Sequence, residues 1–96
     1  MQVFKLNDPV EVGTLKRLHG LDGQFKAAFT VAVDFLNAGD WLFLLHADKP
    51  VPYQLTRFSY APDGTAVLRI EGLTNEAELN DLVGRTVVLP RAELPE

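Results

Sequence analysis

Two histidines are the side chains of this 96-residue chain that are best suited to acid–base or metal chemistry. His19 lies in a glycine-flanked segment, and His46 ends an apolar run. Their spacing matches no metal-binding motif, and a zinc site usually needs three or four His, Cys or carboxylate ligands. The sequence contains no cysteine, which excludes disulfides, thiolate metal sites and cysteine catalysis. We therefore predict no metal site and no cofactor.

A nucleophile paired with a base is the other chemistry that these residue types allow. Ser59 does not lie in a Gly-x-Ser-x-Gly motif, and the sequence pairs neither histidine with an adjacent orienting acid. His19 and Asp22 share one loop, where such a pair usually satisfies local backbone hydrogen bonds. A small hydrolase that uses His19 and Asp22 stays open as an alternative hypothesis, but we predict no catalytic residues and no enzyme activity.

Gly20 and Gly23 bracket the turn that follows His19. A phosphate-binding loop needs a helix directly after its glycines, and here the next segment is an expected strand. The sequence therefore offers no scaffold for a P-loop or a dinucleotide site. A tight turn explains these glycines as well as a binding function does, because glycine serves both purposes.

Charge is unevenly distributed along the chain. The whole sequence has 9 Lys and Arg against 13 Asp and Glu, a net charge of −4, which argues against general polyanion binding. Residues 13–33 carry a local net charge of +2, whereas residues 71–96 carry −4. The positive segment predicts an edge that could face RNA, formed by Lys16, Arg17, His19 and Lys26. The alternative is that these cations are scattered on solvated strands.

Size and composition indicate one domain. Hydrophobic residues make up 47% and charged residues 23% of the sequence, which are ordinary proportions for a globular protein. The N-terminus has neither the basic region nor the long apolar region of a signal peptide. The longest apolar run, residues 41–45, is far shorter than the roughly 20 residues of a membrane-spanning helix. We predict a cytoplasmic protein with no membrane partner.

Short strands separated by turns must position these residues. The pattern predicts strands over residues 10–16, 24–29, 41–46, 51–60, 65–71 and 86–89. Gly13 interrupts the first of them, which indicates a bulge or a close backbone approach. Asn75 and Glu78 form a capping-box pattern for a helix over 75–83. Residues 30–40 fit either a strand or a helical turn, and Trp41 is expected in the core or at its edge. Such a series of strands is typical of a small barrel or sandwich.

Two sets of motifs resemble one protein family. Gly13 followed by His19-Gly20, a hydrophobic residue, one further residue and Gly23 is similar to the opening motif of the bacterial ribosome maturation factor RimM. The ending of that family resembles Glu71-Gly72, Ala77-Glu78, Leu82-x-Gly84 and Leu94-Pro95 in this sequence. Asp22 and Gln24 depart from the family pattern, which commonly has a basic and an acidic residue there. The turn glycines are retained.

The resemblance implies an all-β fold, a small six-stranded antiparallel β-barrel of the translation-protein type with one short helix near residues 75–83. It implies an N-terminal lead-in at residues 1–9, the barrel at 10–90 and an exit linker at 91–96. In the family this linker leads to a second, PRC-type barrel, which these 96 residues do not include. Both a truncated chain and a natural short form agree with this expectation.

The resemblance also implies a ribosome assembly factor that acts by binding. The family assists maturation of the head of the small (30S) ribosomal subunit and processing of 16S rRNA. Its partners are expected to be the 16S rRNA head region and ribosomal protein S19, the latter mainly through the second barrel, and DNA is not among them. The alternative is a generic small β-barrel that binds proteins and has no ribosomal role.

Overall fold

Six strands form the domain. The computed structural model describes residues 8–20, 23–73 and 75–94. In chain order its elements are β1 (Pro9–His19), β2 (Gln24–Phe29), β3 (Trp41–His46), β4 (Lys49–Tyr60), β5 (Thr65–Ile70), α1 (Glu76–Leu82), β6 (Thr86–Pro90) and the 3₁₀ turn η1 (Arg91–Glu93). The predicted all-β class with one short helix is therefore confirmed.

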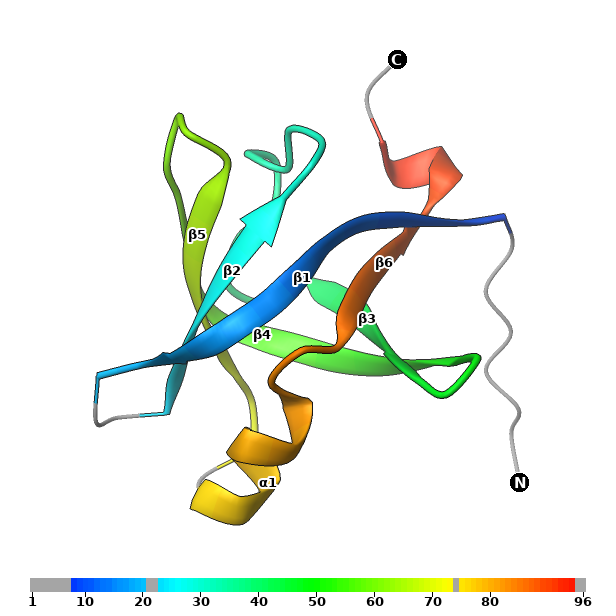
Figure 1. Ribbon diagram of the computed structural model, residues 1–96. Coiled ribbons are helices and arrows are strands. Elements are labelled where there is room, and N and C mark those ends of the chain that lie inside the picture. The colour runs from blue at the N-terminus through cyan, green and yellow to red at the C-terminus, as the bar shows by residue number, and fades with distance from the viewer. Residues whose placement is uncertain (1–7, 21–22, 74, 95–96) are drawn as a thin grey trace.

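The strands close into an antiparallel barrel in the order β1-β2-β5-β4-β3-β6, with β6 pairing back to β1 (Figure 1). In the two longest strands, β1 and β4, different parts of the strand pair with different neighbours. The first part of β1 pairs with β6 and the later part with β2. Residues 49–54 of β4 pair only with β3, and β5 pairs with β4 from Leu55 onward. Pro52 thus lies where β4 has one neighbour, as its missing N–H donor predicts.

Apolar side chains of all six strands fill the barrel. Phe25, Ala27 and Phe29 alternate along β2 and are buried, as their spacing predicts. The prediction for Trp41 was wrong, because half of its surface (51%) is exposed. Trp41 begins β3, whereas the next three residues of the strand are buried. The apolar run that begins at Trp41 correctly predicted a covered strand, and only its first residue is exposed.

Strand β1 does not alternate regularly. Its core-facing residues Val12, Leu15 and Leu18 are spaced by three instead of two. The register shifts against β6 at residues 11–13 and against β2 at residues 15–17. Each shift inserts an extra residue, so the next apolar side chain again points inward. Spacing by three in a strand is therefore the sequence signature of these bulges.

Two segments cover the ends of the barrel (Figure 1). At one end α1 buries Leu79 and Leu82, and the side chain of Asn75 accepts hydrogen bonds from the backbone N–H groups of Ala77 and Glu78. At the other end residues 30–40 form turns, neither strand nor helix, and bury Val33 and Leu36. The helix cap was predicted, and the undecided segment 30–40 is resolved by the structure as turns.

Candidate nucleic-acid interface

Glycine geometry shapes the β1–β2 hairpin. Gly20 and Gly23 both have positive φ, 76° and 75°, which other residues rarely adopt. Gly13 lies in β1, where an added Cβ would be 2.4 Å from the carbonyl oxygen of Ala28. The close approach predicted at Gly13 is thus confirmed. These three glycines of the family motif are required by the backbone, and none of them needs a ligand to explain it.

The predicted cations of β1 are exposed by a bulge. Lys16 is the extra residue in the register shift between Leu15 and Arg17. Leu15 is fully buried, whereas Lys16 and Arg17 are both exposed. A regular strand would have turned one of two successive side chains into the core. The bulge instead places two successive cations in solvent.

Cross-strand pairing brings most of the predicted edge together. Arg17 lies directly opposite Lys26 of β2, and exposed His19 lies opposite Gln24, nearer the turn. Neighbouring Cα atoms at such positions are about 4.5–5.5 Å apart. The structure therefore groups Lys16, Arg17 and Lys26 on one side of the hairpin, with His19 at its end.

Two further arginines, which the sequence patterns missed, extend this surface. Lys26 pairs with Val67 of β5, and Arg69 lies two residues further along the same outward side. Arg69 in turn lies directly opposite Arg57 of β4. We name the outward residues Lys16, Arg17, Lys26, Arg57 and Arg69 the basic sheet face; they come from four neighbouring strands.

A bulge in β4 explains why Arg57 was missed. Strict alternation places Arg57 on the same side as Leu55, which is buried. The register shifts between Leu55 and Arg57, so Arg57 turns outward and is exposed. Phe58 and Tyr60 then pack against the core. The three-residue step from Leu55 to Phe58 is the signal that could have revealed the bulge.

No carboxylate lies opposite any of these cations in the strand pairing of the described residues. Asp63, in the turn between β4 and β5, is an acidic side chain whose pKa is affected by a cation of this face. Hydrogen bonds from the Thr65 hydroxyl (2.7 Å) and backbone N–H (3.0 Å), and to a lesser extent the charge of Lys26, lower the pKa of Asp63 below its usual range. Neither Arg17 nor Lys26 forms an ion pair among the described residues, where ion pairs join Arg85 to Asp81 and Arg91 to Asp8.

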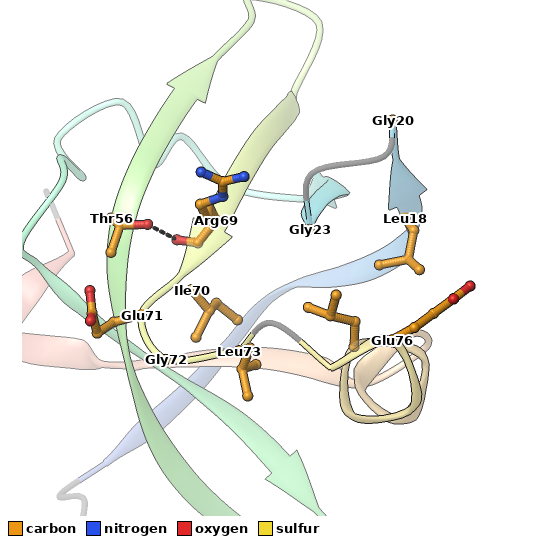
Figure 2. A pocket seen from close by; sticks show the side chains of 11 residues that line it. Leu18, Gly20, Gly23, Thr56, Arg69, Ile70, Glu71, Gly72, Leu73 and Glu76 are labelled. Atoms are coloured by element: carbon orange, nitrogen blue, oxygen red, sulfur yellow. Dashed lines mark hydrogen bonds between the residues drawn. The ribbon is translucent and has the colours of Figure 1, made fainter.

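A groove of about 710 Å³ adjoins the basic sheet face at the α1 end of the barrel (Figure 2). Leu18, Ile70 and Leu73 provide apolar lining, and Glu71 and Glu76 lie at its rim. The hydroxyl of Thr56 donates to the carbonyl oxygen of Arg69 at 3.4 Å across the adjoining strands. The described lining contains neither histidine nor serine.

A histidine–tyrosine pair lines a smaller cavity of about 390 Å³ beneath α1. His46 Nε2 and the Tyr53 hydroxyl are 2.7 Å apart, and their rings stack at 22°. Burial, followed by the charge of Arg85, lowers the pKa of His46, and burial raises the pKa of Tyr53. Both shifts favour the neutral forms, which suits a structural hydrogen bond.

No arrangement of the described residues supports the hydrolase hypothesis. His19 is exposed at the end of β1, and Asp22 lies outside the described residues. No group of three or more His, Asp or Glu side chains is placed to hold a metal ion in the part of the chain that the structure describes. Over the same residues, no helix has the length and apolar character needed to cross a membrane.

The fold and the site define a small closed β-barrel domain with a cationic outer face. The sequence matches the RimM N-terminal domain family over residues 10–94, and the chain belongs to that family. A comparison with curated protein sequences returned no match. Family membership confirms the resemblance that the glycine and ending motifs carry.

Two solved structures share this fold. The chain is 24% identical to a 16S ribosomal RNA processing protein RimM from Pseudomonas aeruginosa, with a TM-score of 0.74 over 92% of this chain and 54% of that one. It is 19% identical to the N-terminal domain of RimM from Thermus thermophilus, with a TM-score of 0.68 over 92% of this chain and 95% of that domain. This chain thus spans about half the length of the P. aeruginosa protein.

Proposed function

We propose that this domain serves in ribosome maturation and 16S rRNA processing, in the cytoplasm, by binding and without catalysing a reaction. Membership of the RimM N-terminal domain family supports this role, as does the name of the P. aeruginosa protein as a 16S ribosomal RNA processing protein. The target is the immature head of the 30S subunit. In members of the family that carry a second barrel, ribosomal protein S19 would be contacted mainly by that barrel.

Binding energy is the means by which such a domain assists assembly. An assembling particle samples several local arrangements of RNA and protein, and a binder shifts the population toward the arrangement it prefers. The shift is limited by the difference between its affinities for the two arrangements. No bond is made or broken in this mechanism, so no nucleophile, base or metal is needed.

The carrying observation is the grouping of Arg17 and Lys26. These cations lie directly opposite each other, and neither makes an ion pair within the described residues. Like charges in this position destabilise a sheet by a few tenths of a kcal/mol to about 1 kcal/mol. A bound polyanion would relieve the repulsion, which favours the Lys16, Arg17, His19 and Lys26 edge as the part nearest RNA.

Co-sedimentation with immature 30S particles tests this function. We expect the 96-residue chain to sediment with these particles at low salt and to dissociate as salt rises, because phosphate contacts release counterions. Mature 70S ribosomes and free S19 serve as comparison partners. Absence of binding to immature particles at low salt would contradict the proposed function and favour a generic protein-binding barrel.

A further inference from the structure

The cations of the basic sheet face come from four strands that are neighbours in the barrel but not in the sequence. The order β1-β2-β5-β4 places Arg17, Lys26, Arg69 and Arg57 across successive strands. Strands lie about 4.8 Å apart, so the row crosses roughly 14 Å of the outer surface. This is a continuous cationic strip and not a single charged corner.

Like charges meet twice in this strip. Arg17 is opposite Lys26, and Arg57 is opposite Arg69. The overall charge of the protein is −4, so a chance distribution would supply carboxylates here more readily than cations. Segregation of the cations onto one sheet face, where neither Arg17 nor Lys26 forms an ion pair among the described residues, indicates a specific anionic partner.

The strip offers charge without aromatic stacking. Phe25 and Phe29 point into the barrel and are buried. Phe58 and Tyr60 pack against the core, with ring centroids 6.1 and 6.4 Å from that of Phe29. Recognition of single-stranded RNA relies on bases that stack on exposed aromatic rings, whereas double-helical RNA is recognised through its shape, phosphates and 2′-hydroxyls.

We propose that the basic sheet face binds double-helical RNA along its sugar–phosphate backbone, without reading base identity. This inference rests on the proposed ribosomal function and names the class of RNA element that the domain contacts. The predicted edge of Lys16, Arg17, His19 and Lys26 is then only one half of the surface, and β4 and β5 provide the other half. Substitution of Arg57, which lies in the basic sheet face but not in the predicted edge, distinguishes these two surfaces.

Fluorescence anisotropy with two RNAs tests the proposal. One is a hairpin with a helix of about 16 base pairs, roughly the length that a double-stranded RNA-binding domain spans. The other is an unstructured uridine-rich strand with the same number of phosphates. We expect the hairpin to bind at least about fivefold more tightly, because the face has several phosphate contacts and no stacking platform.

The decisive variant is Arg17→Glu with Arg57→Glu, which changes the two ends of the strip. Its matched control is Lys49→Glu with Arg91→Glu, which makes the same change in charge at the β3–β4 hairpin and at η1, away from β2 and β5 (Figure 1). We expect hairpin affinity to fall about tenfold or more in the first variant and much less in the second. The slope of log affinity against log salt should fall by about 1.4–1.8, since each of the two lost phosphate contacts contributes about 0.7–0.9.

Circular dichroism melting checks that both variants fold. If the double charge reversal is unfolded, Arg17→Gln with Arg57→Gln replaces it and is expected to give a smaller loss in the same direction. Equal hairpin affinities of the face variant and its control would overturn the proposal, as would tighter binding of the uridine strand. Equally effective displacement of the hairpin by polyglutamate would assign the face to acidic proteins and also overturn it.

Failure of this inference is distinguishable from failure of the proposed function. If the unmodified chain sediments with immature 30S particles and the Arg17→Glu, Arg57→Glu variant does so equally well, the domain acts on the ribosome through another surface. If the unmodified chain does not sediment at all, the ribosomal function itself is wrong.

Discussion

The basic sheet face and the α1 end of the barrel contrast in charge and in what their residues do. At the α1 end, Leu79 and Leu82 are buried, Arg85 is paired with Asp81, and Arg85 also donates to the carbonyl oxygen of Leu45 at 3.1 Å. On the sheet face, Arg17 and Lys26 repel each other and have no ion pair among the described residues. One region stabilises the fold, and the other is the surface to which we assign the proposed binding.

The comparison shows how a protein of net charge −4 can still present a cationic surface. Three acidic residues of the C-terminal part of the chain lie on α1, namely Glu76 and Glu78 in its first turn and Asp81. Negative charge at a helix N-terminus is favourable because the helix dipole is positive there. These α1 acids lie at one end of the barrel, while β1, β2, β5 and β4 present cations on its side.

The largest expected effect on stability is at the α1 end. Leu79 is 6% exposed and belongs to the core, so Leu79→Ala should lower the free energy of unfolding by roughly 2–4 kcal/mol. Urea denaturation followed by circular dichroism measures this change. Binding of hairpin RNA by the fraction that remains folded should be unaltered. A loss below about 0.5 kcal/mol would show that α1 is not part of the core.

A smaller loss is expected beneath the basic sheet face. Gly13→Ala would place a Cβ 2.4 Å from the Ala28 carbonyl oxygen and 2.6 Å from a ring carbon of Phe29, so β1 must shift against β2. Overpacking of this kind costs about 1–3 kcal/mol, measured in the same urea experiment. A loss below about 0.5 kcal/mol would refute the close packing at Gly13.

The next smaller effect is a pH dependence of stability that comes from the α1 end and not from the basic sheet face. Because burial lowers the pKa of His46 below its usual 6.5, the folded state binds fewer protons than the unfolded state as pH falls through 6.5. Stability from this group is present above pH 6.5 and is lost below it, toward the folded-state pKa. The side chain is partly solvated, so we expect an extra fall in melting temperature of about 1–2 °C between about pH 7.5 and 5.5.

The His46→Gln variant identifies the source of that dependence. Its melting temperature should fall less over the same pH interval than that of the unmodified chain. His19→Gln is the matched control, because His19 is exposed on the hairpin of the basic sheet face. If both variants show the same pH profile as the unmodified chain, His46 is not the source of the pH dependence.

No loss of stability is expected on the face itself. Lys16→Glu with Arg17→Glu alters two exposed side chains and replaces the repulsion between Arg17 and Lys26 by attraction, so the free energy of unfolding should rise by a few tenths of a kcal/mol to about 1 kcal/mol. Affinity for immature 30S particles should nevertheless fall clearly at moderate salt. Thermal melting and co-sedimentation measure the two quantities on the same sample. Unchanged affinity would mean that the β1 end of the face is only a solvated surface.

Much of the fold was predictable because local patterns specify it. The alternation of Phe25, Ala27 and Phe29, the glycines of the β1–β2 turn and the Asn75 cap each follow from conformational preference or burial within a few residues. The bulges were harder to predict, because an extra residue changes the face of every later side chain. Arg57 is the clearest example, and the Leu55 to Phe58 spacing is its local trace.

The candidate site was likewise predictable in part from the sequence. The sequence alone identified Lys16, Arg17 and Lys26 as neighbours, since a short hairpin brings its two strands together. It also determined the net charge, the absence of cysteine and the family motifs. Only the tertiary structure placed Arg69 and Arg57 beside them, because barrel closure inserts β5 between β2 and β4. Charges far apart in the sequence become one surface through strand pairing, which depends on the whole core and not on any local pattern.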